Sequence, residues 1–195
     1  MDLILKTATT GLNSDAIVLE LAICDRNYKP IFNERFKPFR KRVWRDTERI
    51  HKISYQDVKN CGRFRDKVEE IKSILQGNRV IIFNAEFDAR LLEQTCKREK
   101  VDDKWVYEQD LHCCMYQAGA HYHNWANYYG GITAWAALDL ALKENNNEHL
   151  NIVQPEALAL ESYDESAMTG CVRTAFIWNV IIEKAERKYE AWLAE

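Results

Sequence analysis

The run RVIIF at residues 79–83 constrains the fold more than any other part of the chain. After Arg79 it is short and apolar, which is typical of a strand that is buried on both faces of a sheet. The residues that follow, AEFDARLLEQTCKRE, have the spacing of an amphipathic helix. A sheet with such a strand needs helices on both of its faces, so this pair of segments predicts an α/β domain.

Three further strands are expected before this run, at residues 2–8, 15–24 and 29–37. The first two are apolar with β-branched residues, and Gly11 and Asn13 separate them. The third, KPIFNERFK, is a plausible strand with Pro30 near its start. Residues 45–76 have a mostly helical pattern. Further helices are expected at 110–117, 134–142 and 165–193, with a loop at 143–156. The order of elements predicts a mixed sheet flanked by helices in a single domain, residues 1–195.

Composition narrows the class of protein. Apolar residues make up 47% of the chain, with only seven Gly and three Pro, which favours a globular chain over a disordered one. The six cysteines form no Cys-x-x-Cys pair, so we expect reduced core thiols rather than a zinc site. No apolar run is long enough to cross a bilayer, and the N-terminus lacks the pattern of a signal peptide. We therefore expect a cytoplasmic protein that makes no contact with a membrane.

Five short motifs occur in a recognisable order. They are TTGL at 9–12, RIHKI at 49–53, FNAEFDARLL at 83–92, GGITAWAALDLAL at 130–142 and ESAMTGCVRTA at 165–175. In this order the sequence resembles the DEDDh 3′–5′ exonucleases, the superfamily of ribonuclease T and of polymerase proofreading subunits, in its bacterial or phage type. The resemblance covers nearly the whole chain, and it implies a ribonuclease H-like fold with a mixed five-stranded sheet.

The resemblance also implies a set of catalytic positions. Members hydrolyse nucleic acid with two Mg²⁺ or Mn²⁺ ions, which four acids hold, and with a histidine that acts as general base. The acids correspond to positions 6, 8, 88 and 170, and the histidine to position 165. This chain has Lys6, Ala8, Asp88, Glu165 and Gly170 at these positions. Only Asp88 matches the pattern.

No other alignment restores the missing groups. No His follows residue 149 and no Asp follows residue 164, so the last helix cannot supply the third motif, and Tyr163 has no Asp four residues later. Asp2 is the only acid before Asp15, and strand geometry places it about 13 Å from position 6. We therefore expect no metal, no cofactor and no nuclease activity.

Lys6 and Asp88 each allow two interpretations. Asp88 is either an ordinary polar residue near a helix start or a retained part of the old site. Lys6 either extends from its strand end into solvent, or its ammonium group stands where a metal stood and neutralises Asp88 and Glu165.

Two segments indicate binding. Residues 36–52 contain seven Lys/Arg and two acids, interleaved with aromatic residues. This pattern suits single-stranded nucleic acid, although a solvated connection with aromatic residues beneath it would look the same. The substrate groove that the family resemblance implies would also bind the nucleic acid, through Thr10, Gly11, Leu12, His51 and Phe87. For His51 alone, packing in the interior is the simpler interpretation.

The second segment, residues 122–135, is rich in aromatic residues, which often anchor protein interfaces. We expect it to bind a protein partner through Tyr122, Trp125, Tyr128, Tyr129 and Trp135. The alternative, a metal pair formed by His121 and His123, is less expected in this context. Homodimerisation is an expectation by analogy with relatives.

Three functions remain open at this point. The first is a pseudo-exonuclease that acts as a binding or regulatory module. The second is a single-stranded nucleic-acid-binding protein that uses this substrate groove. The third is a working 3′–5′ exonuclease with an unorthodox site.

Overall fold

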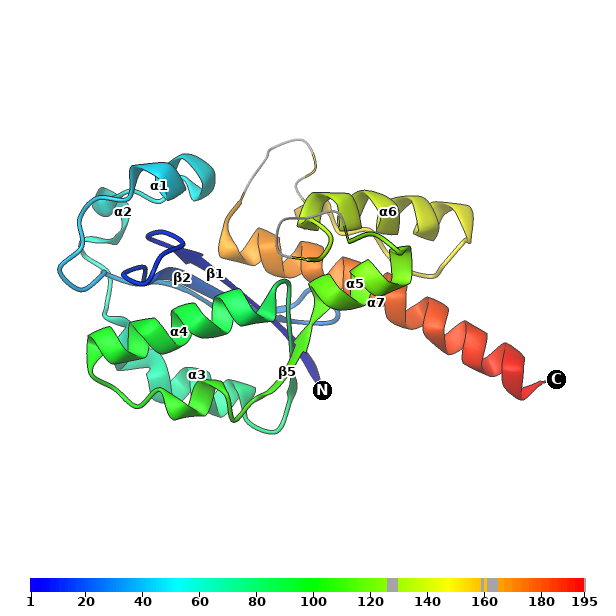
Figure 1. Ribbon diagram of the computed structural model, residues 1–195, viewed down its shortest axis with the longest axis horizontal. Coiled ribbons are helices and arrows are strands. Elements are labelled where there is room, and N and C mark those ends of the chain that lie inside the picture. Colours follow the sequence, from blue (N-terminus) through cyan, green and yellow to red (C-terminus); the bar gives the residue numbers. More distant parts are fainter. Residues whose placement is uncertain (126–129, 159, 161–164, 195) are drawn as a thin grey trace.

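The computed structural model describes residues 1–125, 130–158, 160 and 165–194. At its centre lies a five-stranded sheet in the order β3-β2-β1-β4-β5 (Figure 1). The strands are β1 (Asp2–Thr9), β2 (Val18–Asp25), β3 (Pro30–Arg35), β4 (Arg79–Ile82) and β5 (Asp110–Cys113). β1 pairs antiparallel with β2 and parallel with β4. The predicted mixed five-stranded sheet is confirmed.

Helices cover both faces of this sheet. One face packs against α3 (Val68–Leu75) and α4 (Ala85–Glu99). The other face packs against α5 (Cys114–Tyr122), α6 (Ala134–Asn147) and α7 (Ala167–Leu193). Along β4, Val80 and Ile82 point to the first layer and Ile81 to the second, and all three are fully buried. This alternation explains why residues 80–82 are all apolar.

Short elements complete the chain. α1 (Arg45–His51) and α2 (Tyr55–Val58) lie together at one end of the molecule (Figure 1). There Trp44, Ile53 and Val58 form a third small core with Ala8 and Leu19. The remaining elements are the 3₁₀ turns η1 (Phe64–Lys67), η2 (Lys104–Val106) and η3 (Glu156–Leu158).

Two predicted elements were wrong in part. Residues 110–113 form the edge strand β5, and the helix expected from residue 110 starts at Cys114. The four-residue strand DLHC pairs with β4 on one side and is too short to carry a period of its own. The loop expected from residue 143 begins later, because α6 continues to Asn147. Its buried Asn145 donates from Nδ2 to the carbonyl oxygen of Ile152 at 3.0 Å and so holds the returning chain.

All six cysteines are free thiols, and four of them are buried. Burial raises the pKa of the Cys96 thiol to about 12, so this group remains protonated and unreactive at neutral pH. Within the described residues, no helix is both long enough and apolar enough to span a membrane.

Candidate functional site

Lys6 and Asp88 meet where β1 approaches its end. The ammonium nitrogen of Lys6 donates to both carboxylate oxygens of Asp88, at 2.8 and 2.9 Å. Asp88 is completely buried, whereas the Lys6 side chain is 26% exposed. The pair therefore has its carboxylate in the interior and its cation at the mouth of the site.

Thr7 supplies the remaining partners of this carboxylate. Its backbone N–H and its hydroxyl group both donate to Oδ1 of Asp88, at 2.9 and 2.7 Å. Asp88 lies in the first turn of α4, where the helix dipole also favours a negative charge. The carboxylate thus accepts four hydrogen bonds, and its negative charge is balanced within the protein.

Gly170 faces Lys6 from α7. A Cβ atom built on Gly170 would lie 2.9 Å from Cγ of Lys6 and 3.4 Å from its Cδ. Real Cβ atoms essentially never show a contact as short as 2.9 Å, so the stem of Lys6 fills the space that a side chain at residue 170 would need. Lys6 and Gly170 are therefore sterically matched.

Glu165 is not a partner of Lys6. In the described part of the chain its ion pair is with Arg173, whose Nη1 donates to Oε1 of Glu165 at 3.1 Å. The expectation that Lys6 neutralises Glu165 as well as Asp88 was wrong. The buried Arg173 also donates to the carbonyl oxygen of Leu158 and lies 4.2 Å from the ring centroid of Trp135. A competing cation on α7, Arg173, therefore pairs with Glu165, which lies just before that helix.

Ala8 lies opposite Glu20 of β2. The carboxylate of Glu20 is buried and accepts from Nε of Arg35 at 3.2 Å and from the backbone N–H of Ala167 at 2.9 Å. Glu20 thereby satisfies a free N–H group at the start of α7. It has a structural role close to the site.

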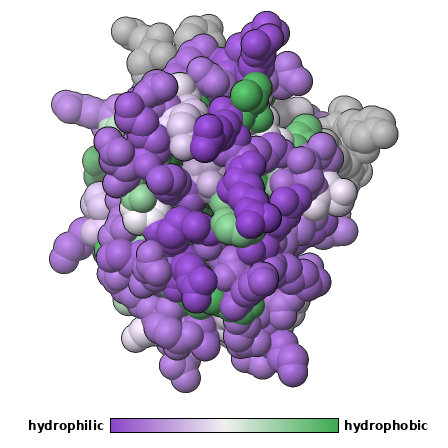
Figure 2. All heavy atoms as spheres, turned by 90° about the vertical axis from the view of Figure 1, so that its left-hand side faces the viewer, coloured by the Kyte–Doolittle hydropathy of each residue, from purple (hydrophilic) through white to green (hydrophobic). Residues whose placement is uncertain are grey.

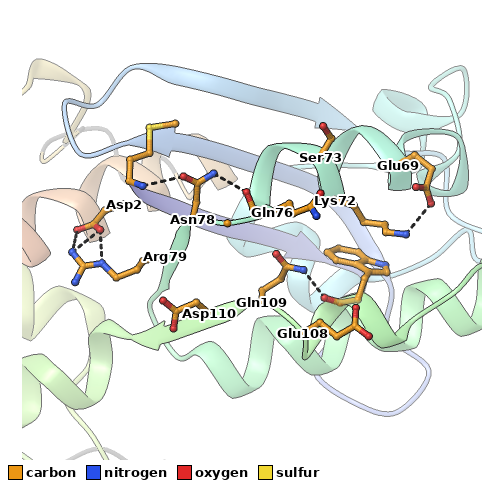
Figure 3. A pocket seen from close by; sticks show the side chains of 13 residues that line it. Asp2, Glu69, Lys72, Ser73, Gln76, Asn78, Arg79, Glu108, Gln109 and Asp110 are labelled. Atoms are coloured by element: carbon orange, nitrogen blue, oxygen red, sulfur yellow. Dashed lines mark hydrogen bonds and ion pairs between the residues drawn. The ribbon is translucent and has the colours of Figure 1, made fainter.

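Asp2 lies at the other end of β1, beside a hollow of about 980 Å³ (Figure 3). Its carboxylate forms a two-pronged ion pair with Arg79, at 2.6 and 2.8 Å, and accepts from Nε1 of Trp178 at 3.2 Å. Asp110 lines the same hollow, at the start of β5. This hollow is separate from the site of Lys6, as strand geometry predicted for Asp2.

The five expected nucleic-acid-binding positions divide into two groups. Thr10 is buried, and its hydroxyl oxygen accepts from the backbone N–H of Ile17. His51 is buried too, with Nε2 hydrogen-bonded to the carbonyl oxygen of Thr9 and Nδ1 accepting from the N–H of Ile53, both at 3.0 Å. Burial lowers the pKa of His51, so the ring is neutral. The side chains of Thr10 and His51 therefore brace the structure and are not available to a ligand.

The second group faces outward. Leu12 is 60% exposed, Gly11 is half-buried, and Phe87 lies half-buried with the ammonium of Lys6 5.8 Å from its ring centroid. Arg90 donates to the carbonyl oxygen of Leu12 at 3.1 Å, which fixes the turn relative to α4. These residues form the rim of the site.

The described aromatic residues of the expected partner surface lie at the end of α5, just after it and in α6. Tyr122 ends α5 and donates from its hydroxyl group to Glu144 of α6, which also accepts from His121. Trp125 is half exposed, and Trp135 is 40% exposed beside Arg173. Tyr128 and Tyr129 lie outside the described residues.

His121, one of the two histidines of the alternative metal pair, is hydrogen-bonded to the carboxylate of Glu144. Among the residues that the structure describes, no three His, Cys, Asp or Glu side chains are grouped as a metal site requires.

Sequence reasoning missed two residues of the site, Thr7 and Arg173. A lone arginine in the apolar stretch CVRTAFIW is a signal of a buried ion pair, so Arg173 could have been found. Thr7 gave no such signal, because its role depends on the position of α4 beside β1.

The comparisons with known proteins agree with this fold. The exonuclease family model of ribonuclease T matches residues 9–150. The chain belongs to the exonuclease family. Its fold is that of the DEDDh-type 3′–5′ exonucleases. The matched stretch begins directly after Ala8 and ends before Glu165, so it contains only one of the five catalytic positions, Asp88.

A curated relative is the "Uncharacterized exonuclease CP81" of Escherichia phage 186. It is 30% identical over 93 residues, which are 48% of this chain and 47% of that protein, so the match spans about half of the relative's length. Among solved structures, exonuclease I has a TM-score of 0.67 at 15% identity, covering 99% of this chain and 43% of its own. Exonuclease X in complex with 5′-overhanging duplex DNA has a TM-score of 0.57 at 16% identity, covering 93% and 92%.

Proposed function

We propose that this member of the exonuclease family has no nuclease chemistry and acts as a binding or regulatory module. The observation that carries the proposal is the ion pair of Lys6 with both oxygens of Asp88. The ammonium group of Lys6 pairs with the one acid that matches the metal-binding positions of the family. The protein accordingly requires no cofactor.

The residues present do not fit a pair of divalent cations. Two-metal hydrolysis needs several carboxylates around ions about 4 Å apart. Of the five positions concerned, only 88 and 165 hold a carboxylate, and Lys6 and Thr7 already use the oxygens of Asp88. Lys6 would also repel any metal ion that approached. Glu165, at the position of the general base, is bound to Arg173.

The steric match of Lys6 with Gly170 supports the same proposal. An aspartate at residue 170 would collide with the Lys6 stem, so lysine at position 6 and the missing acid at position 170 depend on one another. Restoring one acid alone would not restore the site. On this proposal, the packing of β1 against α7 excludes the acid that the family has at residue 170.

A degradation assay tests the proposal. Purified protein is incubated with labelled single- and double-stranded DNA and RNA, with Mg²⁺ or Mn²⁺. We expect no shortening above background, because the acid cluster and the general base are both missing. Progressive 3′ shortening that disappears in Asp88→Ala would overturn the proposal and favour a working exonuclease with an unorthodox site.

A reversion experiment sharpens this test. The quadruple variant Lys6→Asp, Ala8→Glu, Glu165→His and Gly170→Asp restores the family pattern. If the positions are correctly assigned, Mg²⁺ raises the melting temperature of this variant and leaves that of the wild type unchanged, because a ligand stabilises only a fold that binds it. An equal rise in both proteins would show that the wild type binds metal.

Binding of single-stranded nucleic acid is the second candidate. The rim supplies Leu12, Phe87 and Arg90, and exonuclease X, a neighbour in fold, is described in complex with DNA. If the chain binds oligonucleotides in this way, a gel shift should weaken steeply with added salt and should depend on Arg90. A salt-insensitive shift, or no shift at low salt, would remove this candidate.

A further inference from the structure

A hollow of about 710 Å³ opens beside the site, between the turn after β1 and the segment that leads into α1. We refer to it as the α1 groove. Three aliphatic side chains line it and remain largely exposed: Leu12 at 60%, Val43 at 64% and Ile50 at 58%. Large apolar side chains gathered at one hollow are typical of a site that binds a partner.

The fold does not need these side chains. Trp44 and Ile53 fill the small core beneath the groove, and Nε1 of Trp44 donates to the carbonyl oxygen of Ile53 at 2.7 Å. Both residues are buried. The exposed aliphatic groups are therefore additional to the packing that holds α1 in place.

The wall of the groove is fixed before any partner arrives. Thr10 exchanges hydrogen bonds with Ile17, through its hydroxyl oxygen at 3.1 Å and its backbone N–H at 2.9 Å. Arg90 holds the carbonyl oxygen of Leu12. A braced turn costs little conformational entropy on binding, which favours recognition of a specific ligand.

The segment that forms one wall of the groove is basic. Segment 36–52 has seven Lys/Arg against two acids, a net charge of +5 in a chain whose total is −3, so all other residues together carry −8. Lys41 and Arg45 line the groove together with Asp15 and Asp46, and Lys41 pairs with Asp15 at 2.9 Å. Arg42 and Arg49 lie exposed on the adjoining surface. Figure 2 faces the end of the molecule that carries α1 and α2, and it shows apolar patches set among hydrophilic side chains. Charge complementarity thus calls for an acidic ligand.

The chemistry of the walls favours a peptide over a nucleic acid. Single-stranded nucleic acid binds through aromatic faces on which its bases stack. Trp44, the aromatic residue among those that line the groove, is buried and offers no free face. Elsewhere on the protein, cations lie over the rings of Phe39 (Arg40 and Arg63), Tyr55 (Arg42) and Phe87 (Lys6 and Arg90). The groove itself presents aliphatic groups, which suit the apolar side chains of a protein segment.

We propose that the α1 groove binds an acidic peptide segment of a partner protein, with one or two apolar side chains seated between Leu12, Val43 and Ile50. Carboxylates on either side of those side chains pair with the arginines of the surrounding surface. The proposal rests on the proposed function, because it names the kind of partner that the binding module recognises.

A display library of random ten-residue peptides, selected on the full chain, tests the proposal. We expect enriched peptides to combine acidic residues with aliphatic or aromatic ones. Synthetic copies should bind Val43→Ser at least about tenfold more weakly than the wild type, the size of a central interface contact. The matched control is Val153→Ser, since Val153 is 75% exposed away from the groove and should bind as the wild type does.

A charge reversal completes the test. Arg45→Glu should weaken binding about tenfold, whereas the control Arg65→Glu, on the exposed side of η1, should not. The proposal is overturned if selection enriches no peptide, if the enriched peptides lack acids, or if Val43→Ser and Val153→Ser behave alike. It is also overturned if an oligothymidine binds in a manner that Val43→Ser abolishes, since the groove is then a nucleic-acid site. Nuclease activity would refute the proposed function whatever the peptides show.

Discussion

The site of Lys6 and the α1 groove are built from neighbouring residues but differ in one respect. At Lys6, the buried carboxylate of Asp88 has four hydrogen bonds from within the protein. At the groove, only a few residues further along the chain, Leu12 and two aliphatic partners remain exposed to water. In the first region the carboxylate is hydrogen-bonded within the protein, whereas in the second the aliphatic side chains have no such internal packing.

This difference separates stability from function. Removing one member of a buried, fully bonded cluster leaves its partners without hydrogen bonds, which costs free energy. Removing an exposed apolar group costs the fold almost nothing, so its presence is better explained by a partner. The comparison therefore predicts large effects on stability at Lys6 and Asp88, and small ones at the groove.

The largest effect is expected for Asp88→Ala. It leaves the N–H and hydroxyl group of Thr7 unpaired in the interior and removes the counter-ion of Lys6. Breaking a buried ion pair costs about 3–5 kcal/mol of unfolding free energy, and urea denaturation measures it. Glu86→Ala, an exposed acid in the same helical turn, is the control and should change little. Equal effects of the two variants would mean that Asp88 matters only for the start of the helix.

The next largest effect concerns the match of Lys6 with Gly170. In the wild type, Gly170→Ala should destabilise the protein by about 1–2 kcal/mol, because the new methyl group collides with the Lys6 stem. In the Lys6→Ala background the collision is absent. The same change should then stabilise α7 by up to about 1 kcal/mol through helix propensity. A double-mutant cycle measures this reversal of sign.

The cycle also tests the role of the Lys6 ammonium. If Gly170→Ala has the same effect in both backgrounds, the stem of Lys6 does not occupy the space beside α7. If Lys6→Ala alone unfolds like the wild type, the lysine is a passenger in solvent, and the idea of a cation built into the site is wrong.

Features of the fold and the site that depend on residues close together in the sequence could be predicted, whereas most features that depend on distant residues could not. The apolar run at 80–83 and its helix predicted a covered sheet, because periodicity is local. The pairing of Lys6 with Asp88 was one of the two interpretations that motif order left open for Lys6. The partner of Glu165 was not predicted, because Arg173 lies eight residues away on a helix whose packing the sequence does not state. The edge strand β5 was missed since its four residues carry no pattern. The groove was missed because exposure of Val43 and Ile50 is a tertiary property.

A smaller effect is expected for His51 as pH changes. Burial lowers the pKa of His51 below its ordinary value near 6.5. The folded protein holds the ring neutral while the unfolded chain takes up a proton, so stability is complete above about pH 6.5 and falls as pH decreases toward the folded pKa. The loss is at most about 1.4 kcal/mol per pH unit. In thermal melts between pH 7.5 and 5, His51→Gln should flatten this slope. His112→Gln, at the other end of the sheet, should retain it. An unchanged slope in His51→Gln would assign the pH dependence to other groups.

The smallest effect is expected at the α1 groove itself. Val43→Ser and Ile50→Ser should each change the free energy of unfolding by less than about 0.5 kcal/mol, because both side chains are more than half exposed and the core beneath them is complete without them. Urea denaturation of the two variants beside the wild type measures this. A loss of 1 kcal/mol or more would mean that these groups pack against the protein, so the groove would be part of the core and not a binding surface. An unchanged stability together with weakened peptide binding would separate the two regions as the comparison requires: the Lys6 site maintains the fold, and the groove serves the partner.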